Sequence, residues 1–415
     1  MAINIDLIIA LIGLVLTVVT TIIAIIDIKS TIKDNRKNNL LLSDKLLSSE
    51  YWKVYENVRE LYHKTLFRKN ADNNSFSTPS PMLYKEGWLY QKGPLPKLTN
   101  ISLEYVPPEF VKRKLKYNRH LQSKLPYPNK TFEQNLSLVC HSTLYNGRIY
   151  TPVELKVKNG NHYLRISNAY FFDFVNSCLR LSHNDAYSLS MAPKARLRAS
   201  KAFYPFDFTN RVPTIGIVTL TVLFNVEVDN SSKKSAFFVL HKRSSNVAEC
   251  KNMINAIPAG IYQPSFSGSS SVAEPLEYTV FREFGEELLG RKEFSELNDT
   301  EEIQQLFSED QTPLCEKVYY LGAAINPVNL YMELLTILPI DMEKQNNKRI
   351  LGDGTLKEIQ KRLITNEESG EIFLEEFDLK KIRHYSHMHL STPALKQIMT
   401  VLNEHFEEIS TELFK

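Results

Sequence analysis

GSSSVAEPLEYTVFREFGEELLG, residues 268–290, carries the densest chemical signal in the chain. Three of its carboxylates, Glu283, Glu286 and Glu287, stand at positions i, i+3 and i+4, which on a helix share one face with Cβ atoms about 5–6 Å apart. Carboxylates held so close repel one another unless a cation lies among them. Hard oxygen ligands suit Mg²⁺ or Mn²⁺, and Mg²⁺ commonly bridges to substrate phosphates. The stretch therefore predicts a site for a metal-bound polyphosphate.

The spacing within this stretch resembles the Nudix box, G-x5-E-x7-R-E-U-x-E-E-x-G-U, in which U is a large aliphatic residue. The matching residues are Gly268, Glu274, Arg282, Glu283, Phe284, Glu286 and Glu287. Two positions depart from the pattern: Leu289 stands at the second glycine, with Gly290 one residue late, and Phe284 is bulkier than the usual aliphatic residue. The resemblance covers roughly the last 200 residues, about one domain. The alternative is an ordinary solvated acidic face on a surface helix.

Nudix proteins typically hydrolyse a nucleoside diphosphate linked to another group. The resemblance implies that Glu283, Glu286 and Glu287 carry Mg²⁺ or Mn²⁺, which polarises a phosphoryl oxygen and activates a bound water. Glu286 or Glu287 would be the catalytic base that accepts the water's proton. The displaced glycine leaves open whether the domain turns over its ligand or only binds it.

The same resemblance implies supporting roles for other residues. Arg282 is expected to orient Glu283 or Glu274 through a charge-assisted hydrogen bond, and Glu274 is a further metal candidate. Gly268 would permit close approach of the backbone to the metal. Many family members add an acidic ligand from a later loop. Here Glu371 ranks first, and Glu333, within an apolar strand, is its competitor.

The second strong signal is the uncharged stretch from Leu7 to Ile26, LIIALIGLVLTVVTTIIAII. A helix of that length spans about 30 Å, the thickness of the bilayer's hydrocarbon core. The chain start lacks the basic residues and cleavage site of a secretory signal peptide, so we expect a retained single span. Four cations follow it, and the positive-inside rule then places the C-terminal bulk in the cytoplasm. These are Lys29, Lys33, Arg36 and Lys37.

The 415 residues predict an α+β protein of several parts: an anchor at 1–28, a juxtamembrane helix and linker at 29–81, an α+β accessory region at 82–210, and a Nudix-type α/β/α sandwich with a mixed sheet at 211–415. The juxtamembrane helix has two readings, a stalk or oligomerisation element, or a helix packed on its own domain. Strands are expected at 213–228, 236–243, 317–321 and 330–338, a hairpin turn at 158–161, and a closing amphipathic helix at 392–414.

Composition narrows the function classes further. The net charge of +3 is nearly balanced, so no nucleic-acid polymer is expected as a partner. Four scattered cysteines indicate neither a zinc site nor a disulfide framework.

A lone span joined to a Nudix domain resembles the membrane-span–Nudix effectors of bacterial CBASS antiphage systems. That resemblance implies an inner-membrane homo-oligomer whose cytosolic domain binds a cyclic oligonucleotide and drives membrane disruption. The alternative is a membrane-tethered, Mg²⁺-dependent hydrolase of nucleoside diphosphate derivatives. A structural membrane protein with a vestigial Nudix fold is the third reading.

Overall fold

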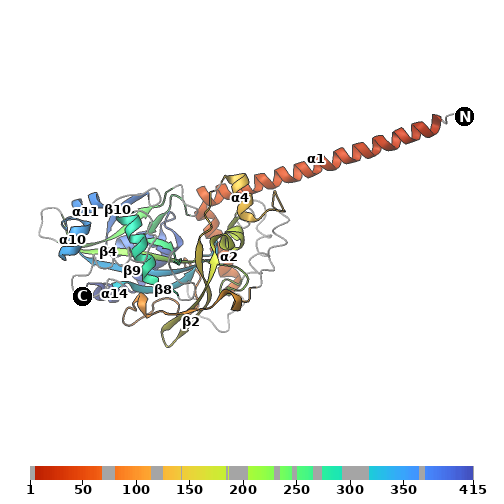
Figure 1. Ribbon diagram of the computed structural model, residues 1–415. Coiled ribbons are helices and arrows are strands. Elements are labelled where there is room, and N and C mark those ends of the chain that lie inside the picture. The colour runs from red at the N-terminus through yellow and green to blue at the C-terminus, as the bar shows by residue number, and fades with distance from the viewer. Residues whose placement is uncertain are drawn as a thin grey trace.

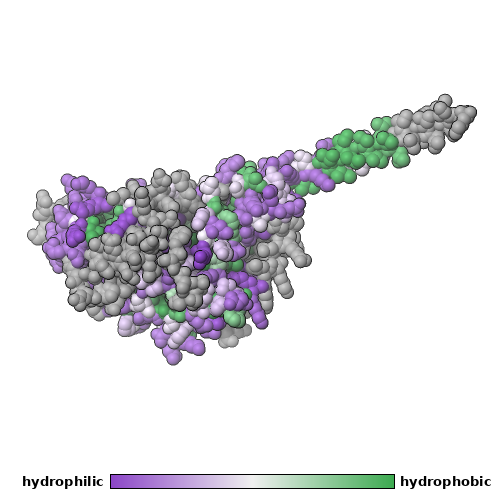
Figure 2. Space-filling view, in the orientation of Figure 1, coloured by the Kyte–Doolittle hydropathy of each residue, from purple (hydrophilic) through white to green (hydrophobic). Residues whose placement is uncertain are grey.

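The N-terminal helix dominates the outline of the molecule. The computed structural model describes residues 5–67, 80–113, 125–141, 143–183, 186, 204–228, 234–244, 250–264, 273–291, 317–363 and 370–414. Helix α1 (Ile5–Ser49) contains the whole predicted apolar stretch and projects away from the body, with the N-terminus at its far tip (Figure 1). Figure 2 shows its exposed apolar surface, which includes Leu14 at 63% and Ile28 at 59% exposure. Among the described residues, only α1 is long and apolar enough to cross a membrane.

Beyond its apolar part, α1 continues into the body. The first contacts are made by Lys33, whose ammonium lies 4.7 Å from the centroid of the Tyr127 ring, and by Arg36, which donates to the Leu125 carbonyl at 3.4 Å. Leu40 and Ser43 are then buried. The helix from Leu14 to Ile32 is exposed throughout and is therefore free of the body, about 28 Å long at 1.5 Å per residue.

Helix α2 (Tyr51–Phe67) follows α1 after a break at Glu50. Its buried side chains recur every three or four residues: Tyr51, Val54, Tyr55, Val58 and Tyr62. This spacing places one stripe of the helix against the body. The predicted juxtamembrane helix is confirmed in type, although it is two helices. Of the two alternatives, a stalk or a helix packed on its own domain, the second describes the residues from Leu40 onward, because one face of this segment is buried against the body.

A seven-stranded mixed sheet forms the centre of the body, in the order β10-β5-β4-β9-β8, with β6 beside β5 and β7 beside β4. Strands β4 and β9 are parallel, and the other pairs are antiparallel. The predicted strands are confirmed as β4, β5, β8 and β9. The strand bounds are β4 (Ile215–Glu227), β5 (Lys234–Lys242), β6 (Ile254–Ala256), β7 (Ala259–Ile261), β8 (Tyr319–Ile325), β9 (Met332–Asp341) and β10 (Glu371–Glu376).

Helices cover both faces of this sheet, because side chains alternate between two cores along each strand. Ile215 and Ile217 of β4 lie in the core shared with α2 and α8 (Leu276–Glu283), whereas Val218 and Leu220 pack toward the C-terminal helices. Those helices are α12 (Leu379–His387), α13 (Pro393–Glu404) and α14 (Phe406–Leu413). The single closing helix predicted at 392–414 is wrong, since His405, with φ −126°, leaves the helical conformation between α13 and α14. Two short helices, α10 (Gln345–Leu351) and α11 (Leu356–Arg362), follow β9.

A smaller three-stranded sheet, ordered β1-β3-β2, lies in the predicted accessory region. The predicted turn at 158–161 joins β2 (Arg148–Lys158) to β3 (Asn161–Tyr170), with positive φ at Asn159 and Gly160, as a two-residue hairpin loop requires. The other elements of this region are η1 (Leu98–Asn100), β1 (Ser102–Tyr105), η2 (Pro108–Phe110), α4 (Phe132–Cys140), α5 (Phe171–Phe174) and η3 (Val175–Leu179). The segment before β1 pairs with β8 through Leu83, Leu89 and Lys97 and so extends the edge of the large sheet.

Candidate functional site

The acidic stretch folds as the sequence spacing predicts, with one modification. Pro275 caps helix α8, and the chain then continues through a wider π-helical turn, η4 (Phe284–Leu288). Apolar side chains hold this helix on the sheet; they are Leu276, Val280, Phe281, Phe284 and Leu288. Leu289 is the C-cap of the helix, and Gly290 follows it in the left-handed conformation, with φ +62°, where glycine commonly ends a helix. Gly268 lies outside the described residues.

Two of the three central carboxylates point toward the short strand β7. Glu283 lies against Gly260, where an added Cβ would meet its Oε1 at 2.0 Å. Glu287 is 7% exposed and accepts a hydrogen bond from the Ala259 amide at 2.9 Å. Glu286, between them, is half-buried. The predicted common face is therefore confirmed for Glu283 and Glu287.

Arg282 makes the charge-assisted hydrogen bond that the sequence predicts. Its Nη2 donates to Glu283 Oε1 at 2.6 Å and to the Ile261 carbonyl at 3.0 Å. Burial lowers the pKa of the Arg282 guanidinium, but the nearby carboxylates, Glu283 above all, outweigh burial and raise this pKa overall. The arginine therefore stays charged and fixes the position of Glu283 against β7.

A second set of polar groups surrounds the start of α8. The hydroxyl of Tyr262 donates to the backbone carbonyl of Glu274, and the Tyr262 ring lies 4.4 Å from that of Tyr150. Burial raises the pKa of Glu277, in the first turn of α8, and so favours its neutral form. Sequence reasoning missed Glu277; its only signal was its position three residues after Glu274.

The carboxylate oxygens of this stretch are donors of the type that Mg²⁺ and Mn²⁺ prefer. Within the described part of the chain, however, no three His, Cys, Asp or Glu side chains gather in a group that could hold a metal ion. Glu283 and Glu287 each use one oxygen on a protein donor. Metal binding here therefore stays a prediction, and no chemical step is assigned to it.

The two candidates for a further acidic ligand lie in different places. Glu371 is exposed at the start of β10, opposite Lys242 on the outer pair of strands. Glu333 is 5% exposed in β9, opposite Gly216 of β4, and lines a cavity. The backbone of Gly260 lines the same cavity and contacts Glu283, so the cavity adjoins the acidic stretch.

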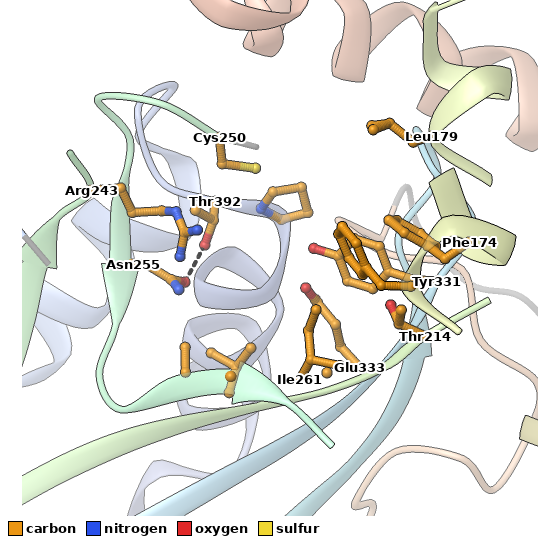
Figure 3. Close-up of a pocket in the computed structure, with 16 residues that line it drawn as sticks. Phe174, Leu179, Thr214, Arg243, Cys250, Asn255, Ile261, Tyr331, Glu333 and Thr392 are labelled. Carbon is orange, nitrogen blue, oxygen red and sulfur yellow. Dashed lines mark hydrogen bonds between the residues drawn. The ribbon is translucent and has the colours of Figure 1, made fainter. Parts of the chain in front are cut away.

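In this cavity, of about 170 Å³, a polar side lies opposite an aromatic side, and Glu333 and Thr214 lie beside the aromatic rings (Figure 3). Arg243, Asn255 and Thr392 lie on the polar side, where Thr392 Oγ1 donates to Asn255 Oδ1 at 2.6 Å. Phe174 and Tyr331 lie opposite, with their ring centroids 6.3 Å apart. Two of these residues had a partial signal in the sequence: Arg243 ends the predicted strand at 236–243, and Phe174 lies in an apolar stretch of the accessory region.

The aromatic side of the cavity belongs to a core that includes the end of α1. Leu40 of α1 packs in one buried cluster with Phe174, Val175, Cys178 and Leu179. Phe174 and Leu179 also line the cavity, and the partly buried cavity residues Phe171, Ile261 and Tyr331 pack against the cluster. A continuous set of packed side chains therefore joins the cavity to the helix that carries the apolar segment.

No protein-family model matches this chain, and a search of the curated proteins finds no similar protein. Function is therefore inferred from the residues and their geometry.

Proposed function

We propose that this chain is a membrane-anchored effector of a bacterial antiphage (CBASS) system, with a cytosolic Nudix-type domain that binds a cyclic nucleotide second messenger. The observation that carries the proposal is the packing of Leu40 with cavity residues Phe174 and Leu179. A ligand that favours one arrangement of this core would bias the position of α1. Such a bias requires different affinities for the two arrangements, and a shared packed core supplies a physical means.

Under this proposal, α1 crosses the inner membrane and the body lies in the cytoplasm. The cations Lys33 and Arg36 contact the body at the base of the exposed apolar part, where the membrane surface would lie. Within the apolar part, the hydroxyls of Thr20 and Thr21 donate to backbone carbonyls of the preceding turn. Their polar groups are thus satisfied inside the helix, as a lipid-exposed helix requires. The predicted homo-oligomer would form through these exposed faces.

The second candidate is a membrane-tethered, Mg²⁺-dependent hydrolase of nucleoside diphosphate derivatives. The observation that favours it is the contact between Glu283 and Gly260, because it brings an acidic-stretch carboxylate next to the cavity wall.

The experiment that separates these functions uses the full chain in dye-loaded vesicles of bacterial lipids. Cyclic di- and trinucleotides are added with Mg²⁺, and dye release and nucleotide hydrolysis are followed in parallel, with sugar nucleotides and ADP-ribose as linear substrates. We expect release with one cyclic nucleotide and no turnover. Hydrolysis of a linear substrate without release would select the hydrolase. Absence of both, with no nucleotide binding, would refute the proposal.

Two matched variants test the route through the core. Phe174→Leu changes a buried ring that lines the cavity and packs in the Leu40 cluster. Leu138→Ala is the control: helix α4 contributes to the same cluster, but the Leu138 side chain is 49% exposed. Phe174→Leu is expected to reduce dye release, and Leu138→Ala is expected to leave it unchanged. Equal dye release from both variants would show that this core does not couple ligand binding in the cavity to α1.

A further inference from the structure

The size of the cavity limits what it can hold. Typical small-molecule sites occupy roughly 300–1,000 Å³, whereas this cavity has about 170 Å³. It therefore suits one ring system of a larger ligand, with the remainder outside. The aromatic side chains of Phe171, Phe174 and Tyr331 offer apolar faces on which a flat ring can stack.

The polar side chains determine which ring fits. Glu333 is buried in the cavity wall, and an ionised carboxylate only accepts hydrogen bonds. Its two oxygens can accept from two neighbouring N–H groups at once, the bidentate geometry. Gly216, its partner on β4, lines the same cavity, and an added Cβ there would only come into ordinary contact with Glu333 Cγ at 3.5 Å. Asn255, whose Oδ1 accepts from Thr392, retains its amide N–H groups as donors.

From this geometry we propose that the cavity binds a guanine base, with the Glu333 carboxylate accepting from the N1–H and the exocyclic N2–H₂ of the ring. Guanine presents these two donors side by side. Adenine places a ring acceptor at N1, which an acceptor-only carboxylate repels, and uracil has a single N–H between two carbonyls. Asn255 and Arg243, on the opposite side, match the acceptors O6 and N7 or a phosphate at the mouth. The inference rests on the proposed nucleotide binding and specifies its base.

Three mononucleotides that differ only at this edge test the proposal: GMP, IMP, which lacks the N2 amine, and AMP. Dissociation constants would be measured by titration calorimetry on the full chain in detergent. A bidentate contact of this kind changes affinity by about 5- to 150-fold. We therefore expect GMP to bind at least about tenfold more tightly than AMP, with IMP between them.

The variant Glu333→Gln should reduce this GMP preference to near unity, because one oxygen acceptor becomes a donor. Glu104→Gln is the matched control, since Glu104 is an exposed carboxylate on β1 with Arg165 as its partner. It should keep the wild-type preference. The wild-type order of GMP, IMP and AMP is informative even if Glu333→Gln does not fold.

Two outcomes would overturn the inference, and they differ in what else they affect. Equal binding of AMP and GMP, or an unchanged preference in a folded Glu333→Gln protein, would remove guanine recognition and leave nucleotide binding intact. No binding of any of the three in the millimolar range, together with no binding of cyclic nucleotides, would remove the proposed function as well.

Discussion

Replacing Gly260 with alanine should test how the acidic stretch is held against the sheet. The new Cβ would lie 2.0, 2.1 and 2.5 Å from Oε1, Cδ and Cγ of Glu283. Cβ atoms essentially never approach other heavy atoms closer than 3.0 Å, so the carboxylate must retreat by about 1 Å or more. Because Arg282 and Glu283 side chains are only 12% and 14% exposed, solvent would compensate little for a weakened ion pair.

The expected magnitude follows from two overlapping effects. Overpacking costs about 1–3 kcal/mol, and loss of a hydrogen bond to a charged group costs about 1.5–3 kcal/mol. Since both arise from one displacement, they do not add, and we expect Gly260→Ala to lower the free energy of unfolding by about 2–3 kcal/mol. At about 2–4 °C per kcal/mol, the melting temperature should fall by about 4–12 °C.

Differential scanning fluorimetry of the detergent-solubilised chain would measure this change. Gly216→Ala is the matched control, because Gly216 is also a strand residue without positive φ and its added Cβ would meet nothing closer than 3.5 Å. In a Glu283→Ala background, Gly260→Ala should cost little, because the clashing side chain is gone. A melting temperature unchanged by Gly260→Ala, or additive effects in the double variant, would refute the reasoning.

Three further predictions concern other parts of the molecule. Leu40→Ala should lower the free energy of unfolding by about 2–4 kcal/mol, whereas Leu41→Ala, 46% exposed, should change it by less than about 0.5 kcal/mol; denaturant titration compares them. Burial lowers the pKa of His183 to about 3, so below pH 6.5 the unfolded chain takes up a proton that the folded chain does not. Stability should fall by about 1.4 kcal/mol per pH unit from 6.5 toward 3, and melting curves of His183→Gln should show a weaker decline. Glu286→Gln combined with Glu287→Gln should abolish any effect of Mg²⁺ on nucleotide binding, which calorimetry with and without EDTA would detect; an unchanged Mg²⁺ effect would show that other residues bind the metal.

Local patterns in the sequence were sufficient for most of the secondary structure. The β-branched residues of 213–228 predict β4, and Asn159-Gly160 predicts the hairpin. The spacing of the acidic stretch predicts the helix and the contact between Arg282 and Glu283. Each depends on residues a few positions apart.

Features that bring together residues far apart in the sequence could not be predicted from such local patterns. The parallel pairing of β4 with β9 joins residues more than 100 positions apart, and it places Glu333 beside Gly216. The cavity combines Phe174 of α5 with Asn255 of β6 and Thr392 before α13, and no sequence period links these segments. The helix break at His405 could not be predicted, because no glycine or proline, the usual signals of a helix end, lies near it in the sequence.

The unbroken helix α1 also has a mechanical consequence. From Leu40, where it is clamped in the body, to Leu14 it rises about 39 Å without a hinge residue that would absorb bending. A rigid rod of that length acts as a lever arm, and a tilt of about 5° at its fulcrum displaces the other end by about 3 Å. If lipid restrains that end, the body must swing instead. Small repacking beside Leu40 would thereby be magnified into a change of orientation relative to the bilayer.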